Sequence, residues 1–116
     1  MRIFLMLLVV PFFAACAGEK SASVGTNVSL YKYIGSAQCN GGGTPLAAMQ
    51  RQLIDAGIQV HASACGGDGK FYPAVCGASD GRIGIFDIAP AQVPGASTLG
   101  FAPLSSLPSA TKTVCP

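Results

Sequence analysis

Cysteines are the residues in this chain whose type could most readily do chemistry. There are five of them, namely Cys16, Cys39, Cys65, Cys76 and Cys115. No two are spaced as Cys-x-x-Cys, and the sequence has a single histidine, His61. A structural zinc site usually shows closely spaced pairs of such ligands. Because these pairs are missing, a zinc site is only weakly indicated, and we expect neither a metal nor a cofactor. Structural disulfides in an oxidising compartment are the favoured interpretation of the last four cysteines.

A thiol-redox role for Cys39 is the main chemical alternative. Cys39 lies just before the start of a predicted helix, where the helix dipole and free backbone N–H groups would favour a thiolate. No second cysteine lies close to it in the sequence to act as a resolving thiol. The redox role therefore stays an alternative to a structural disulfide.

Other polar motifs indicate loops rather than an active site. Gly41-Gly42-Gly43 could cradle an anion at a helix start, but the lysine and the serine or threonine of a P-loop do not follow. Asp68 and Asp80 each precede a glycine, as turn residues commonly do. His61 is expected to face solvent from a strand. No catalytic residue is therefore predicted.

Residues 1–15 have the pattern of a bacterial signal peptide. Arg2 supplies a positive charge, and Ile3 to Phe13 form an apolar run that is interrupted only by Pro11. A membrane-spanning helix needs about 20 apolar residues, whereas a shorter run followed by small residues is typical of a signal peptide. The sequence therefore predicts export from the cytosol.

The end of this segment resembles the lipobox of bacterial lipoproteins. The matching residues are Phe13-Ala14-Ala15-Cys16, with phenylalanine where leucine is usual. The resemblance implies that Cys16 becomes the N-terminus and carries a diacylglycerol and an acyl chain, which would anchor the protein in a membrane. Residues 16–27 would then be the lipidated cysteine and a flexible tether. Ala17 after the cysteine implies the outer membrane, with the domain facing the periplasm.

A second cleavage site is an open alternative. Ala15-Cys16-Ala17 also fits the A-x-A pattern, and cleavage there would release a soluble periplasmic or secreted protein that begins at Gly18. Under either reading Cys16 is not a free thiol of the mature domain. Four cysteines, an even number, then remain for pairing.

Apolar periodicity and turn residues divide residues 28–116, which we expect to be a single domain, into short elements. Thr44-Pro45 marks a helix start and Gly57 a helix end, and the apolar stripe of Leu46, Met49, Leu53 and Ile54 predicts a helix over 44–56. The other expected elements are strands over 28–35, 58–64, 71–76, 82–88 and 100–104, a turn over 66–69, a second helix over 90–99, and an irregular tail over 105–116. The 82–88 strand is apolar on both faces, as expected at the centre of a sheet.

The order is β-α-β-(β)-β-α-β, in which the bracketed strand is the edge strand over 71–76. It predicts an α+β fold, a small ferredoxin-like β-α-β-β-α-β sandwich in which helices cover one face of a mostly antiparallel sheet. In this order the chain resembles sporulation-related repeat domains over residues 28–104. Those small envelope modules bind peptidoglycan glycan strands, so the resemblance implies peptidoglycan as a candidate partner. It is a likeness of architecture, which by itself assigns no function.

The expected topology ranks the three ways in which four cysteines can pair. Cys65 and Cys76 would lie at opposite ends of a short strand, roughly 20 Å apart, which is too far for a disulfide. Cys39 and Cys65 each follow a strand that runs in the same direction in a βαβ unit, so both are expected at one sheet edge. We therefore predict the bridges Cys39–Cys65 and Cys76–Cys115.

The charge balance gives no indication of nucleic-acid binding. One of the seven basic residues is Arg2, which leaves six against five acidic residues, and they form no basic run. The leading prediction is a non-catalytic cell-envelope binding or assembly-accessory module that acts on another envelope protein or on peptidoglycan. The alternatives are a periplasmic thiol-redox factor using Cys39 and, if cleavage precedes Gly18, a freely secreted effector or inhibitor. The oligomeric state is left open.

Overall fold

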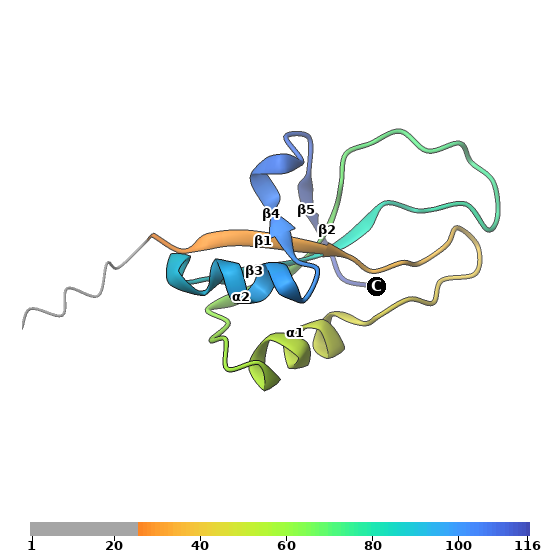
Figure 1. The fold of residues 1–116 in the computed structure, drawn as a ribbon. Coiled ribbons are helices and arrows are strands. Elements are labelled where there is room, and N and C mark those ends of the chain that lie inside the picture. Colours follow the sequence, from red (N-terminus) through yellow and green to blue (C-terminus); the bar gives the residue numbers. More distant parts are fainter. Residues whose placement is uncertain (1–25) are drawn as a thin grey trace, which may run out of the picture.

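A computed structural model describes residues 26–116, in which short strands build one antiparallel sheet beside two α-helices (Figure 1). The strands are β1 (Val28–Tyr33), β2 (Ala62–Gly67), β3 (Arg82–Ile88), β4 (Ala102–Pro103) and β5 (Thr111–Thr113). Their order across the sheet is β4-β1-β3-β2-β5, and every neighbouring pair is antiparallel. The predicted α+β class is confirmed. The predicted signal peptide, Cys16 and most of the tether lie outside the described residues.

The central strand β3 has the continuous apolar pattern that its position requires. It pairs with β1 on one side and β2 on the other. Phe86 and Ile88 lie in one buried cluster, while Ile83 and Ile85 lie in another on the opposite face. Because successive side chains of a strand point to opposite faces, both faces of β3 are covered. The prediction of a central strand over 82–88 is confirmed.

Helix α1 (Leu46–Asp55) forms where the apolar stripe predicted it, although only part of the stripe is buried. Pro45 is the N-cap residue and contributes no side-chain cap. Gly57 follows the helix with a φ of 78°, the left-handed conformation expected after a helix end. Met49 and Leu53 are fully buried, whereas Ile54 is 47% exposed. The core therefore covers the Met49 and Leu53 part of the stripe and leaves Ile54 at its margin.

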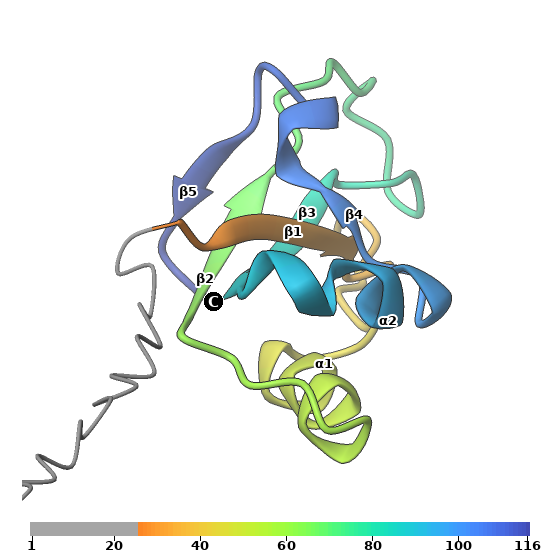
Figure 2. The same cartoon turned by 60° about the vertical axis from the view of Figure 1, so that its left-hand side comes forward.

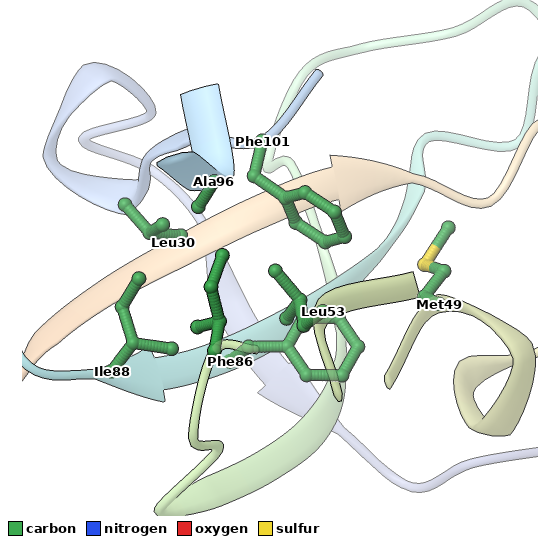
Figure 3. Close-up of a cluster of buried hydrophobic side chains, with 8 residues drawn as sticks. Leu30, Met49, Leu53, Phe86, Ile88, Ala96 and Phe101 are labelled. Atoms are coloured by element: carbon green, nitrogen blue, oxygen red, sulfur yellow. The ribbon is translucent and has the colours of Figure 1, made fainter. Parts of the chain in front are cut away.

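The second helix also forms, in two parts. A single 3₁₀ turn (Pro90–Gln92) leads directly into α2 (Val93–Thr98), which confirms a short helix within 90–99. Both helices lie on one side of the sheet (Figures 1 and 2). Figure 3 shows the cluster between them and the sheet, whose buried members are Leu30, Met49, Leu53, Ile58, Phe86, Ile88, Ala96 and Phe101.

The C-terminal segment covers the other face of the sheet. After β4 the chain makes a 3₁₀ turn (Leu104–Ser106) and places Leu107 against Ile83 and Ile85. It then forms β5, which pairs with β2. The prediction of an irregular tail over 105–116 is therefore wrong over Thr111–Thr113. The tail forms a strand because β2 would otherwise leave an unpaired sheet edge.

Three further predictions are corrected in β2 and in the loop that follows it. The strand begins at Ala62 rather than Ile58, whose side chain is 5% exposed and packs in the helix-side core. Gly66 and Gly67, which were expected in a turn, continue β2. No strand forms over 71–76, where Pro73 removes a backbone donor and the chain is a loop.

Two long loops leave the sheet at the same end. Residues 34–45 follow Tyr33, which pairs with Ile83, and residues 68–81 connect Gly67 to its own pairing partner Arg82. We call these segments the loop pair. Val28 pairs with Ile88 at the other end of the sheet, which is where the described chain begins. The loop pair therefore projects away from the start of the described chain (Figure 1).

Candidate functional site

Both pairs of cysteines are bridged, but not in the predicted combination. The disulfides are Cys39–Cys76 and Cys65–Cys115, with Cα–Cα distances of 5.1 and 5.2 Å. The prediction of Cys39–Cys65 and Cys76–Cys115 is wrong. It treated the 71–76 segment as a strand and the C-terminal segment as a free tail. Instead the 68–81 loop folds onto residues 35–43, and β5 lies beside β2, which brings Cys115 next to Cys65.

Gln38 joins the two loops around the Cys39–Cys76 bridge. Its side-chain amide donates to the carbonyl oxygens of Pro73 and Ser79, at 2.9 and 3.1 Å, and accepts from the backbone N–H of Val75 at 3.1 Å. Its backbone N–H donates to Ala78, and its carbonyl accepts from Gly77. One covalent bond and five hydrogen bonds therefore fix the loop pair. Nothing in the sequence around Gln38 marked this role.

Asp68 anchors the base of the 68–81 loop. Its side chain is 3% exposed and accepts hydrogen bonds from the Tyr33 hydroxyl at 3.0 Å, the Tyr72 hydroxyl, and the Lys70 backbone N–H at 2.9 Å. Burial alone would raise the pKa of Asp68, but the bonds from Tyr72, Lys70 and Tyr33 outweigh it and hold that pKa below 3.8. Asp68 is thus a turn residue, as predicted, and also a buried acceptor.

The two tyrosines respond in the opposite direction. Burial and the hydrogen bond to Asp68 raise the pKa of Tyr33 above 10.0. The hydrogen bond to Asp68, followed by burial, raises the pKa of Tyr72 above the same value. Both phenols are therefore neutral at physiological pH and donate hydrogen bonds to the Asp68 carboxylate. These bonds hold the base of the 68–81 loop against β1.

Asp80 plays a similar part at the other end of the same loop. It accepts hydrogen bonds from the Ser36 hydroxyl at 2.6 Å and from the Arg82 backbone N–H at 3.1 Å. The Arg82 Nε lies 3.6 Å from the same carboxylate. Burial works to raise the pKa of Asp80, yet the bond from Ser36 and the proximity of Arg82 lower it below 3.8. The two acidic groups of the loop are therefore turned inward.

Apolar side chains project from this braced loop into solvent. Phe71 is 94% exposed and Val75 is 56% exposed. The neighbouring Lys70 is exposed as well. With Asp68 and Asp80 occupied inside the loop, the exposed charge next to Phe71 is positive. This apolar and basic surface, which we call the Phe71 surface, was missed from the sequence because the segment was expected to be an edge strand.

A cleft of about 350 Å³ lies at the same end of the sheet, between the 34–45 loop and the C-terminal segment. Its lining includes Ile34, Ser36, Leu46, Cys65, Arg82 and Cys115. A second hollow of about 300 Å³ adjoins it and shares Ile34, Cys65, Arg82 and Pro116. Arg82 contributes the charged side chain that lines both hollows.

The remaining predicted site residues do not gather into a reactive centre. His61 is exposed near the opposite end of the sheet, at the start of β2. Gly41, Gly42 and Gly43 all have positive φ and follow the turn over residues 38–40, which the Ala37–Gly41 bridge closes. Cys39 is in a disulfide rather than a free thiol. Among residues 26–116, no three histidine, cysteine or acidic side chains are grouped so that they could hold a metal ion.

Comparison with known proteins gives no family for this chain. No protein-family model matches it, and neither the curated proteins nor the solved structures include a significant match. Neither helix among residues 26–116 has the length and apolarity needed to cross a membrane. Function is therefore inferred from the loop pair, the Phe71 surface and the cleft.

Proposed function

We propose that this protein is an exported, non-catalytic binding module of the bacterial cell envelope that holds a partner protein on its Phe71 surface. The observation that carries the proposal is a phenylalanine that is 94% exposed on a loop fixed by a disulfide. An exposed aromatic side chain on a rigid loop has already lost most of the backbone freedom that binding would remove. Aromatic residues are also enriched among the side chains that dominate interface energies.

The proposed export fits the bridged cysteines. Disulfides persist in oxidising compartments such as the periplasm and are rare in the cytosol. Two bridges in so small a domain agree with the signal-peptide pattern of residues 1–15. Cys16 is the proposed lipid-bearing residue, and two or three acyl chains would hold the protein stably in the outer membrane.

The direction of the loop pair favours a partner away from the anchoring membrane. The chain would arrive from Cys16 at the Val28 end of β1, whereas the Phe71 surface projects from the Tyr33 end. A partner in the periplasm could then be met without the domain turning back toward the lipid. A membrane surface is for this reason not the proposed occupant.

The chemistry of the surface favours a protein with an apolar patch bordered by acidic groups. Phe71 and Val75 would enter the apolar patch, and Lys70 would face the acidic border. Complementary charge of this kind mainly increases the rate and specificity of association. Peptidoglycan is the competing partner, and its sugars offer fewer apolar contacts to Val75.

The finer fold assignment also belongs to this proposal. We infer a ferredoxin-like core because the order β4-β1-β3-β2 and the antiparallel pairing agree with a β-α-β-β-α-β chain whose two crossovers each contain a helix. The strand β5 and the two disulfides would be additions to that core. The likeness to sporulation-related repeat domains remains one of architecture.

A thiol-redox function is the second candidate, because Cys39 and Cys76 are both exposed. A thiolate could therefore reach this bridge more easily than the one that contains Cys65, which is 5% exposed. A freely secreted effector or inhibitor remains the alternative if cleavage precedes Gly18.

Site-specific crosslinking in producing cells tests the partner. A photoreactive phenylalanine analogue is placed at position 71 of the full chain, and in a matched strain at position 54. Ile54 is 47% exposed on α1 and lines neither the 68–81 loop nor the two hollows, so it is an exposed apolar control. The proposal expects a discrete protein adduct from position 71 that is absent from position 54.

Two results would contradict this assignment. One is an identical adduct pattern, or no adduct, at both positions. The other is sedimentation of the purified protein with isolated sacculi that is lost in Phe71→Ser and retained in Ile54→Ser, which would identify peptidoglycan as the occupant. Circular dichroism of both variants checks that each is folded.

A further inference from the structure

We propose that the cleft beside Arg82 binds the free carboxylate of a small apolar ligand, such as the C-terminal end of a short peptide. This site is separate from the Phe71 surface and goes beyond the proposed function. The cleft has a volume of about 350 Å³. That is near the lower end of the usual range for small-ligand sites, about 300–1,000 Å³.

The walls of the cleft are mainly apolar. Ile34 and Leu46 contribute aliphatic side chains, Pro45 contributes its ring, and the Cys65–Cys115 bridge closes the side nearest to β5. Such walls gain from burying small apolar groups. They offer little to a sugar or another strongly hydrated ligand, because buried hydroxyl groups would lack partners.

Arg82 supplies the polar group that would orient the ligand. Half of its side chain is exposed, and it lines both hollows. Its Nε lies 3.6 Å from the Asp80 carboxylate, and among residues 26–116 its two terminal nitrogens donate no hydrogen bond to a side chain. A guanidinium can donate two parallel hydrogen bonds to one carboxylate.

The local charge selects a singly charged anion. Asp80 lies beside Arg82 and is itself held by Ser36, so it offsets part of the guanidinium charge. Asp80 would repel the second charge of a phosphate, whereas a carboxylate needs only the two terminal nitrogens. The ligand class is therefore an apolar carboxylate, which could be a peptide C-terminus or a short aliphatic acid.

Calorimetric titration of the oxidised mature chain tests the proposal with two matched peptides. The first is N-acetyl-Ala-Ala with a free carboxylate, and the second is the same peptide as its C-terminal amide. Loss of a charge-assisted pair should weaken binding at least about tenfold, so the acid should bind and the amide should bind at least that much more weakly. Hexanoate is the third ligand. If it binds more tightly than the peptide acid, the carboxylate recognised by the cleft belongs to an aliphatic acid rather than to a peptide C-terminus.

Three variants separate recognition from stability. Arg82→Gln should weaken binding of the acid at least about tenfold, while Arg51→Gln, on the exposed surface of α1, should leave it unchanged. Asp80→Asn keeps an amide oxygen as acceptor for the Arg82 backbone N–H, and its amide nitrogen can donate to the Ser36 hydroxyl, which can rotate to accept. The variant removes the competing charge, so it should tighten binding. A merely structural role for Asp80 and Arg82 would weaken binding in both variants.

Equal binding of acid and amide, or weaker binding by a folded Asp80→Asn variant, would overturn the proposal. The peptide comparison needs no variant, so it decides the matter even if Arg82→Gln fails to fold. Phe71→Ser should bind the acid normally. Failure of this site and failure of the Phe71 surface can therefore be told apart.

Discussion

At the scale of single residues, the polar groups of the loop pair are bracing groups whose partners come from distant parts of the sequence. Asp68 joins Tyr33 of β1 to Tyr72 of the loop, and Asp80 joins Ser36 to Arg82. Among residues 26–116, no buried side-chain nitrogen or oxygen lacks a hydrogen-bond partner. The rigidity of the Phe71 surface follows from these bonds together with the Gln38 contacts.

Replacement of Asp68 by asparagine should destabilise the domain by about 1–3 kcal/mol, because the amide nitrogen cannot accept from the tyrosine hydroxyls. The free energy of unfolding, measured by urea denaturation, should fall accordingly. Asp55→Asn is the matched control, since Asp55 is exposed at the end of α1. Equal stability of both variants would contradict a bracing role for Asp68.

The pH dependence of stability should show losses at both extremes. Asp68 and Asp80 have folded-state pKa values below 3.8, so their stabilisation is present above the unfolded-state pKa and is lost as the pH falls through the folded-state values. Tyr33 and Tyr72 have pKa values raised above 10.0. Their contribution is present below that pH and is lost as the pH rises through the raised values.

Thermal melting across the acid range measures the first of these losses. Asp68→Asn should flatten the acid decline, because one of the two carboxyl groups with a lowered pKa has been removed. An acid decline of unchanged steepness in that variant would exclude Asp68 as a contributor.

At the scale of elements, two adjacent glycines in β2 show why the C-terminal strand can form. A Cβ atom at Gly66 would lie 2.6 Å from the carbonyl oxygen of Thr111 and 2.7 Å from Ile85 Cδ1. A Cβ atom at Gly67 would have nothing within 4 Å. Gly66 therefore makes room for β5 and for the Leu107 cluster, while Gly67 does not.

Gly66→Ala should destabilise the domain by about 1–3 kcal/mol through overpacking. Gly67→Ala, one position away in the same strand, should be neutral or slightly stabilising, because alanine loses less conformational entropy than glycine on folding. Urea denaturation compares the two variants. A similar loss in both would show that strand propensity, rather than the contact with Thr111, decides the outcome.

The disulfides can be assigned chemically with single cysteine variants. Cys115→Ser should leave Cys65 as the thiol that is alkylated in denaturant, and Cys39→Ser should leave Cys76. Peptide mapping reads out the labelled residue, and a label on Cys76 in Cys115→Ser would contradict the pairing. Each loss should cost about 4 kcal/mol, since the bridges close loops of 37 and 50 residues.

At the scale of the whole molecule, the described domain has two structurally different ends. The chain enters at the Val28 end, and the loop pair and the cleft lie at the Tyr33 end. Helices cover one face of the sheet and the C-terminal segment covers the other. If the protein is anchored as proposed, the lipid anchor would join the domain at the Val28 end, and the proposed binding surfaces would lie at the Tyr33 end.

Intact mass of the mature protein tests export, anchoring and bridging together. The expected species begins at Cys16, carries a diacylglycerol and an acyl chain, and gains two hydrogens for each of two bridges on reduction. Cys16→Ala should abolish acyl labelling. A mature chain that begins at Gly18 without lipid would instead support the freely secreted form, and a full-length chain with free thiols would contradict export.

The sequence by itself determined the local elements that have a strong periodic pattern. Met49 and Leu53 recur at helical spacing before Gly57, and residues 82–88 are apolar throughout, so the first helix and the central strand were predictable. These patterns depend on neighbours along the chain. The use of cysteines for disulfides was also predicted, from their even number after Cys16 and from the expected export signal.

The tertiary structure alone decided the cysteine pairing, the β5 strand and the position of the Phe71 surface. Each depends on contacts between segments far apart in the sequence, such as Cys65 with Cys115 or Gln38 with Pro73. The residue pattern from Phe71 to Cys76 resembles that of a strand. The segment is a loop instead, held by the Cys39–Cys76 disulfide and by the hydrogen bonds of Gln38. Local propensity amounts to a few tenths of a kcal/mol per residue, so one long-range bridge of about 4 kcal/mol outweighs it.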